Sequence, residues 1–165
     1  MKKIIVLVVS FILVFATGLR AESQQGYLLQ INIVDIARAE IGHGEQGDNN
    51  KGKYVKEYLR GQEDLPWCAG FVSYCAKKAG YNLRYTLRAK DFLKLGIQVS
   101  RPKSGDLIVF SRKGGGHVGI VSGVYGNNII TIEGNLGKYP AKVKECHYEL
   151  GQIKNLIGFI RLEKK

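Results

Sequence analysis

A chain of 165 residues has room for one domain with a full hydrophobic core and too little for two of ordinary size. Its 45% hydrophobic and 24% charged residues exclude a disordered or low-complexity chain. The formal net charge of +11 predicts attraction to anionic surfaces. Neither a run of like charges nor an RNA-type aromatic motif accompanies that charge, so nucleic acid is not an expected partner.

The first 21 residues predict an export signal. Lys2 and Lys3 precede an apolar run over residues 4–15 that is too short for a comfortable membrane span, and Ala21 supplies a small residue for cleavage. We expect cleavage after Ala21, a secreted or periplasmic protein without a stable membrane anchor, and a single domain over residues 22–165. An uncleaved N-terminal anchor is the alternative. Anionic polymers of a bacterial envelope are candidate partners for the remaining basic domain.

Two short helices are expected next, over residues 33–41 and 53–60. Asn32 can cap the first, and Gly61 ends the second. On the first helix, Glu40 interrupts an apolar stripe, and we expect its side chain to snorkel to water.

The loop over residues 42–52 raises the question of a metal. It holds oxygen donors but lacks the alternating carboxylates and fixed glycine of a calcium loop. His43 has no second histidine or cysteine at ligand spacing, so it is expected to be a loop histidine. No metal and no cofactor are expected. The donors considered are Glu45, Asp48, Asn49 and Asn50.

The stretch over residues 66–80 predicts a helix with a thiol in its first turn. Its apolar residues repeat with helical spacing, Pro66 suits the entry and Gly80 suits the end. Because a helix start presents free N–H groups and a partial positive charge, a sulfur there is biased towards thiolate. Cys68 is therefore a candidate nucleophile. The alternative is a small buried hydrophobic residue.

The second half of the chain predicts strands. Thr86 looks like the N-cap of a helix that ends before Gly96. Short apolar and alternating runs then predict five strands. Because helices precede strands, we predict an α+β fold in which the Cys68 helix packs on an antiparallel sheet. The predicted strands span residues 107–110, 117–124, 129–135, 141–148 and 156–162.

A histidine and two polar residues on neighbouring strands can complete a site with the thiol. A three-residue loop over residues 125–127 would pair Gly119 with Glu133 and His117 with Asn135, which puts both polar side chains on the His117 face. A two-residue loop would turn Glu133 to the other face. Gly119 has no side chain and is expected to leave open space beside the imidazole.

This arrangement assigns a task to each residue. Cys68 would attack a carbonyl carbon, His117 would act as base and acid, and Glu133 or Asn135 would fix the tautomer of the ring. Backbone N–H groups at the helix start could hold the oxyanion. The alternative is that His117 is a surface residue at a strand end and the other two are turn residues. Cys75 and Cys146 could form a disulfide or stay two buried thiols.

Four blocks of sequence resemble one known family, the CHAP amidase/endopeptidase domains of the papain-like superfamily. The resemblance covers about residues 30 to 162 and implies a papain-like fold. It also implies Cys68 as nucleophile, His117 as base, and Glu133 with Asn135 completing the site. In the related NlpC group the third residue is usually a second histidine, so Glu133 favours the CHAP branch. The blocks are residues 66–72, 104–110, 116–121 and 132–135.

The resemblance implies that the substrate is bacterial peptidoglycan. We therefore expect an exported cysteine hydrolase that cuts an amide bond of the wall peptide, as an N-acetylmuramoyl-L-alanine amidase or a peptide endopeptidase. Some relatives bind calcium in the loop before the cysteine, but this loop is poor in carboxylates. The alternatives are a non-catalytic module that binds envelope glycopeptide and a papain-like peptidase directed at proteins. A toxin aimed at a competitor's wall would use the same chemistry.

Overall fold

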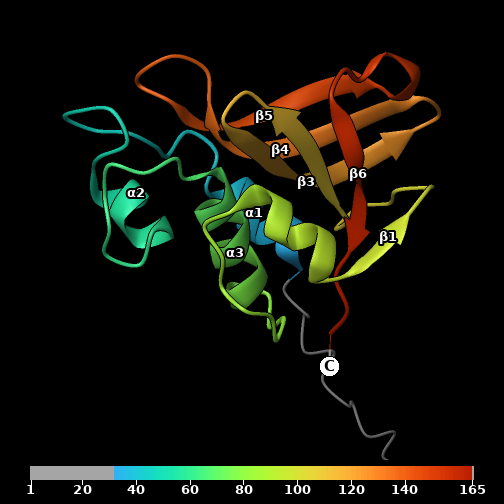
Figure 1. Ribbon diagram of the computed structural model, residues 1–165, viewed down its shortest axis with the longest axis horizontal. Coiled ribbons are helices and arrows are strands. Elements are labelled where there is room, and N and C mark those ends of the chain that lie inside the picture. Colours follow the sequence, from blue (N-terminus) through green and yellow to red (C-terminus); the bar gives the residue numbers. More distant parts are fainter. Residues whose placement is uncertain (1–31, 165) are drawn as a thin grey trace, which may run out of the picture.

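A computed structural model describes residues 32–164 of the chain as one antiparallel sheet with helices against one face (Figure 1). The predicted export signal lies outside the described residues. The sheet order is β1-β6-β2-β3-β4-β5, and the α+β prediction is confirmed. The strands are β1 (Ile97–Val99), β2 (Leu107–Arg112), β3 (Gly115–Tyr125), β4 (Asn128–Leu136), β5 (Lys142–Glu149) and β6 (Leu156–Arg161).

Three α-helices and two 3-10 helices complete the described chain, and none of them is long and apolar enough to cross a bilayer. Asn32 caps α1 as predicted, because its Oδ1 accepts the N–H groups of Val34 at 2.8 Å and Asp35 at 2.9 Å. The helices are α1 (Ile33–Ala39), α2 (Lys53–Tyr58), α3 (Cys68–Lys78), η1 (Ala89–Lys94) and η2 (Leu150–Gln152).

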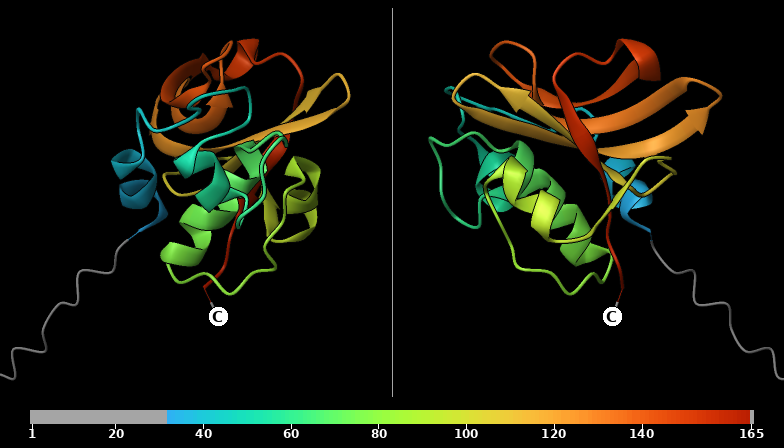
Figure 2. Two further views of the ribbon diagram at one scale, coloured as in Figure 1. Left: turned by 90° about the vertical axis from the view of Figure 1, so that its left-hand side faces the viewer. Right: turned by 45° about the vertical axis from the view of Figure 1, so that its right-hand side comes forward.

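Helix α3 lies at the centre of the helical layer and packs on β3 and β4 (Figure 2). Both of its ends follow from the sequence. At its start, Trp67 is the N-cap and makes no side-chain capping bond, which leaves the first N–H groups free of a side-chain partner. At its end, Gly80 adopts a φ of +82°, and the N–H of Tyr81 bonds back to the carbonyl of Ala76.

Apolar side chains fill both faces of the sheet. Val118 and Ile120 of β3 belong to the large core under the helices, whereas Val121 belongs to a smaller cluster on the opposite face. Because side chains alternate along a strand, His117 and Gly119 point to the same face as Val121. The imidazole therefore lies on the face that includes Phe110, whose ring centroid is 5.9 Å from that of His117.

The sequence analysis misplaced one helix and missed one strand. The helix predicted from Thr86 is a 3-10 helix that begins at Ala89, because the Thr86 hydroxyl is used in a tighter turn: it accepts the Arg88 N–H at 3.1 Å and donates to Asp91 at 2.7 Å. Strand β1 was not predicted. It has three residues, all partly or fully exposed, and its position depends on pairing with β6.

The turn between β3 and β4 also differs from the prediction, yet the predicted face is right. The loop has two residues, because Tyr125 pairs with Asn128. A bulge at Ser122 then shifts the register by one, so that Ile120 pairs with Ile132. The shift cancels the effect of the shorter loop and restores Glu133 to the His117 face.

Candidate active site

His117 and Glu133 form a buried pair. The ring Nε2 donates to Glu133 Oε2 at 2.6 Å, and the two side chains are 1% and 0% exposed. A carboxylate that is buried and bonded in this way holds both the orientation and the tautomer of an imidazole. Burial alone would lower the pKa of His117, but the neighbouring Cys68 and Glu133 raise it above its usual value.

Two further residues, which the sequence reasoning missed, hold Glu133. Its Oε1 accepts hydrogen bonds from Thr131 Oγ1 at 2.6 Å and from Tyr148 Oη at 2.9 Å. Burial would raise the pKa of Glu133, but His117 and these two hydroxyl groups lower it, so the carboxylate stays ionised. Thr131 could have been inferred, since it lies two residues from Glu133 on the same face. Tyr148 could not, because its placement depends on the register of β5.

Gly119 has a different use from the one expected. The space beside the imidazole is not open: a Cβ on Gly119 would lie 2.5 Å from Glu133 Cγ. The missing side chain thus makes room for the carboxylate that orients the ring. Gly134 acts similarly on the other face of β4, where a Cβ would lie 2.8 Å from Phe71 and from Trp67. This close approach holds β4 against the first turns of α3.

Cys68 and His117 influence each other directly. The second ring nitrogen, Nδ1, is buried and is the one such side-chain atom without a hydrogen-bond partner in residues 32–164. Burial raises the pKa of the Cys68 thiol, but the imidazole, the N–H of Val118 and the charge of Arg112 together lower it below its usual value. With Nε2 committed to Glu133, Nδ1 is the nitrogen available to take a proton from the sulfur.

Asn135 is placed differently from Glu133. It adopts a φ of +56° where β4 departs from regular pairing with β5. Its side chain makes no hydrogen bond to His117 among the described contacts. It lines the same cavity as Cys68 instead. The imidazole is therefore bonded to Glu133, whereas Asn135 belongs to the lining of the cavity beside Cys68.

The cavity beside Cys68 has a volume of about 610 Å³, in the range typical of ligand sites. It lies between the segment around η1 and the hairpin that joins β2 to β3, and Cys68 and Asn135 reach it from α3 and β4. Its remaining lining residues are Pro66, Leu87, Arg88, Ala89, Lys90, Asp91 and Arg112 to Gly116.

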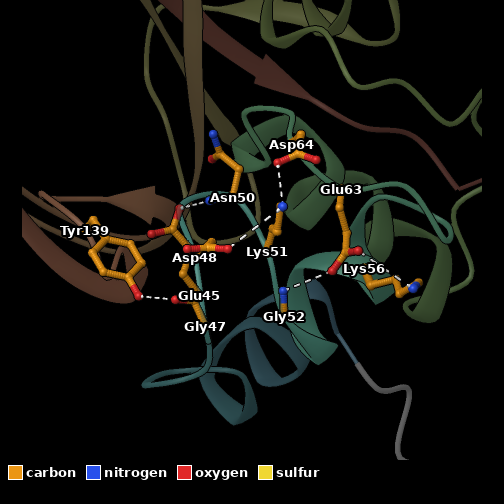
Figure 3. A network of polar contacts seen from close by, with 10 residues as sticks. All are labelled: Glu45, Gly47, Asp48, Asn50, Lys51, Gly52, Lys56, Glu63, Asp64 and Tyr139. Carbon is orange, nitrogen blue, oxygen red and sulfur yellow. Dashed lines mark hydrogen bonds and ion pairs between the residues drawn. The ribbon is translucent and has the colours of Figure 1, made fainter.

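Glu45, which is 5% exposed, joins the loop between α1 and α2 to the residue before α3. Its carboxylate accepts the N–H of Ala141 at 2.6 Å, the N–H of Asn50 at 3.0 Å and the Trp67 indole N–H at 3.3 Å. Figure 3 shows the bond to Asn50, with Lys51 between Asp48 and Asp64 nearby. The oxygens of Glu45 thus fix the residue that precedes Cys68. In residues 32–164, no cluster of three or more His, Cys, Asp or Glu side chains could hold a metal ion.

Glu40 does not snorkel, so that expectation is wrong. Its side chain is 15% exposed and accepts hydrogen bonds from His43 Nδ1 at 2.8 Å, Tyr58 Oη at 2.7 Å and Tyr74 Oη at 3.1 Å. The imidazole of His43 also stacks on Tyr54, with ring centroids 3.8 Å apart. We call Glu40, His43, Tyr58 and Tyr74 the Glu40 cluster. It ties α1 to α2 and α3.

The three cysteines are free thiols, which decides against a disulfide between Cys75 and Cys146. Cys75 is buried on α3, and burial together with Glu40 raises its pKa well above the usual value. Cys146 is half-buried on β5, and burial and the charge of Glu133 raise its pKa to about 11. Cys68 is thus the thiol whose surroundings favour the reactive form.

Solved structures share this α+β fold, and one of them is described as a peptidoglycan hydrolase. The peptidoglycan hydrolase RipB of Mycobacterium tuberculosis matches with a TM-score of 0.53 and 18% identity, over 81% of this chain and 64% of that one. Ly7917 with the hydrolysis product of MDP matches with a TM-score of 0.53 and 15% identity, over 78% of this chain and 60% of that one. A variant of RipA, described as interacting with a resuscitation-promoting factor, matches with a TM-score of 0.51 and 18% identity, over 81% of this chain and 61% of that one.

Residues 60–135 match the model of the CHAP domain, which confirms the resemblance seen in the sequence. The matched stretch contains Cys68, His117, Glu133 and Asn135. The chain spans about three fifths of the length of the solved structures it resembles. No curated protein matches the sequence.

Proposed function

We propose that this protein is an exported cysteine hydrolase that cuts an amide bond of the peptidoglycan peptide. The observation that carries the proposal is the state of one imidazole: Glu133 holds one nitrogen of His117, and the other is unpartnered and buried beside the Cys68 thiol. A structural histidine satisfies both of its ring nitrogens, whereas a base needs one free. The cavity gives a substrate access to the Cys68 thiol.

In the first step the Cys68 sulfur attacks the carbonyl carbon of the scissile amide. The thiol proton resides on His117 Nδ1, and the carbonyl oxygen becomes an oxyanion. The uncapped N–H groups at the start of α3 are suited to stabilise this oxyanion, as is the Asn135 carboxamide in the cavity lining. The C–N bond then breaks, and the imidazolium gives its proton to the leaving amine. The product is a thioester between Cys68 and the acyl part of the peptide.

The second step returns the enzyme to its starting state. Water takes the place of the amine, and His117 Nδ1 accepts one of its protons as the oxygen attacks the thioester carbon. The C–S bond breaks, the carboxylic acid leaves, and the proton returns to the thiolate–imidazole pair. Throughout both steps the Glu133 carboxylate stabilises the imidazolium and prevents the ring from turning.

Peptidoglycan as substrate is supported by the CHAP match and by the name of the hydrolase RipB, whose fold this chain shares. The scissile bond is either the one between muramic acid and the stem peptide, as in an amidase, or one within the peptide, as in an endopeptidase. We further propose that residues 1–21 are a cleaved export signal and that residues 22–165 are the secreted or periplasmic catalytic domain. This location would bring the basic domain to its polymer, with the anionic envelope as a secondary attraction.

Incubation of purified sacculi with wild type and with Cys68→Ala tests the proposal. Wild type should release new amino groups and a defined set of muropeptides, and mass spectrometry of their ends identifies the bond. Cys68→Ala should bind the sacculi and release none. Equal behaviour of the two proteins would instead indicate a binding module. If the protein cleaves casein and leaves sacculi uncleaved, it is a peptidase directed at proteins.

A further inference from the structure

Four basic side chains line the cavity at Cys68. Arg88 and Lys90 come from the segment that enters η1, and Arg112 and Lys113 come from the hairpin that joins β2 to β3. All four residues are exposed. None of them forms an ion pair or a side-chain hydrogen bond with another residue in the described part of the chain. Two separate elements thus present unpaired positive charge to the space where the substrate would bind.

The acidic residue in the same lining does not offset this charge. Asp91 Oδ2 accepts a hydrogen bond from Thr86 Oγ1 at 2.7 Å and pairs with Arg84 at 3.2 Å. The Asp91 carboxylate therefore has partners of its own, one of them an arginine outside the lining. The cavity keeps the positive charge of its four basic residues.

Some basic residues elsewhere are paired, whereas the four in the cavity are not. Lys51, which precedes α2, lies 3.6 Å from Asp64, and Lys56 of α2 lies 3.8 Å from Glu63 (Figure 3). On β6, Arg161 pairs with Asp106 at 2.7 Å. Charges that only keep a domain soluble need no such concentration beside the nucleophile.

Arg112 lines the same cavity as the Cys68 nucleophile. Burial, His117 and the N–H of Val118 have larger effects on the pKa of Cys68, and the charge of Arg112 adds a smaller effect that lowers it. A guanidinium that shares the cavity with the sulfur can bind a carboxylate in the part of the substrate that the cavity holds, next to the scissile amide.

We propose that the cavity selects wall peptides that carry a free carboxylate beside the scissile bond over the same peptides with that group amidated. This proposal rests on the proposed function. A volume of about 610 Å³ fits a short stretch of peptide, and a long polyanion would need a charged track extending beyond it. The carboxylate and the carboxamide have nearly the same shape, so only the charge distinguishes them. Arg88 and Arg112, which come from different elements of the lining, are the residues best suited to bind it bidentately.

Two matched pairs of synthetic stem peptides test the proposal. In each pair one free carboxylate, first that of the γ-linked glutamate and then that of the diamino acid, is compared with its carboxamide. For at least one pair, wild type should show kcat/KM about tenfold higher for the carboxylate. Raising the ionic strength should reduce this ratio. Equal kcat/KM within both pairs would overturn the proposal.

Charge-neutral variants locate the selectivity. Arg88→Gln and Arg112→Gln should reduce the ratio to between about one and three, because each removes a carboxylate partner. Arg112→Gln will also change the reactivity of the thiol, but this change affects both members of a pair equally and leaves the ratio interpretable. Lys94→Gln is the matched control, since Lys94 is exposed on the same 3-10 helix as Lys90 and lies outside the cavity. A ratio unchanged by both arginine variants would contradict the assignment.

Binding to Cys68→Ala separates the two proposals. If wild type cleaves no peptide but Cys68→Ala binds the carboxylate form about tenfold more tightly, the hydrolase proposal fails and the selectivity stands. If Cys68→Ala binds the carboxylate and carboxamide peptides equally, the selectivity proposal fails, whether or not wild type cleaves them. Displacement of both forms alike by poly(glycerol phosphate), with no preference between them, would assign the cations to a polyanion and would also overturn the proposal.

Discussion

Two clusters in this protein are each built from a glutamate, a histidine and two hydroxyl donors, but they differ in how the glutamate acts on a nearby thiol. In the first, Glu133 binds His117, Thr131 and Tyr148; in the second, Glu40 binds His43, Tyr58 and Tyr74. Each also has a cysteine of α3 nearby, Cys68 in the first and Cys75 in the second. Both carboxylates have lowered pKa values because hydrogen bonds outweigh burial.

The difference lies in what stands between carboxylate and thiol. At Cys68 an imidazole with a free nitrogen intervenes, so the negative charge of Glu133 stabilises a cation that in turn stabilises a thiolate. At Cys75 the Glu40 charge acts on the sulfur directly and, together with burial, opposes ionisation. Glu133 therefore favours ionisation of one thiol through the imidazole, and Glu40 opposes ionisation of the other. The order of the groups, and not the residue types alone, sets the direction of the pKa shift.

The largest expected effect is from removing each histidine. His117→Ala should lower kcat/KM by about 10²- to 10⁴-fold, because the proposed base is lost. His43→Ala should leave kcat/KM within about twofold, since the Glu40 cluster does not face the cavity. Turnover of sacculi or stem peptide measures both. If His43→Ala is the more damaging change to activity in protein that remains folded, the two clusters have been assigned the wrong way round.

Neutralising each carboxylate should separate activity from stability. Glu133→Gln keeps the shape but removes the charge opposite the imidazolium, so kcat/KM should fall about 10- to 100-fold. The bell-shaped pH profile of kcat/KM should narrow in this variant, since the Cys68 thiolate–His117 imidazolium pair loses part of its stabilisation. Glu40→Gln should lower the free energy of unfolding by about 1–3 kcal/mol and leave the pH profile unchanged. A narrowed profile in Glu40→Gln would contradict the comparison.

Deleting one hydroxyl from each cluster should give a smaller version of the same contrast. Tyr148→Phe removes a donor to Glu133, and we expect a loss of a few fold in kcat. Tyr74→Phe removes a donor to Glu40 and should cost about 1 kcal/mol of unfolding free energy with kcat unchanged. Denaturant titration and initial rates check the two variants together. Loss of activity from Tyr74→Phe alone would speak against the contrast.

The pH dependence of stability has the smallest expected effect. A carboxyl group whose pKa is lowered in the folded state stabilises the protein above its unfolded pKa of about 4.3, and this stability is lost as the pH falls through the folded value. Both glutamates should therefore make the protein less stable in acid. His117, with a raised pKa, stabilises below about 6.5, and that part is lost as the pH rises through its folded value. In urea titrations, the free energy of unfolding of Glu133→Gln and of Glu40→Gln should each fall less at acidic pH than that of wild type.

The comparison also explains what could be predicted from the sequence. The Cys68 helix and the sheet face of His117 could be predicted because they depend on local periodicity and strand alternation. The bulge at Ser122 could not be predicted. The predicted face of Glu133 is nevertheless correct, because the error in loop length and the missed bulge cancel. The Glu40 cluster was missed because its donors come from three segments brought together by packing. The same holds for Tyr148, since strand register over long separations leaves no local signal.

The most direct test of the central claim is the pH dependence of alkylation at the two α3 thiols. Iodoacetamide labelling of native protein, followed by peptide mass spectrometry, reports Cys68 and Cys75 in one experiment. Cys68 should label with an apparent pKa below the ordinary thiol value of about 8.5 and shift upward in Glu133→Gln, while Cys75 stays unlabelled until the protein unfolds. Labelling of Cys68 that rises only above about pH 8.5 and ignores Glu133→Gln would contradict the account.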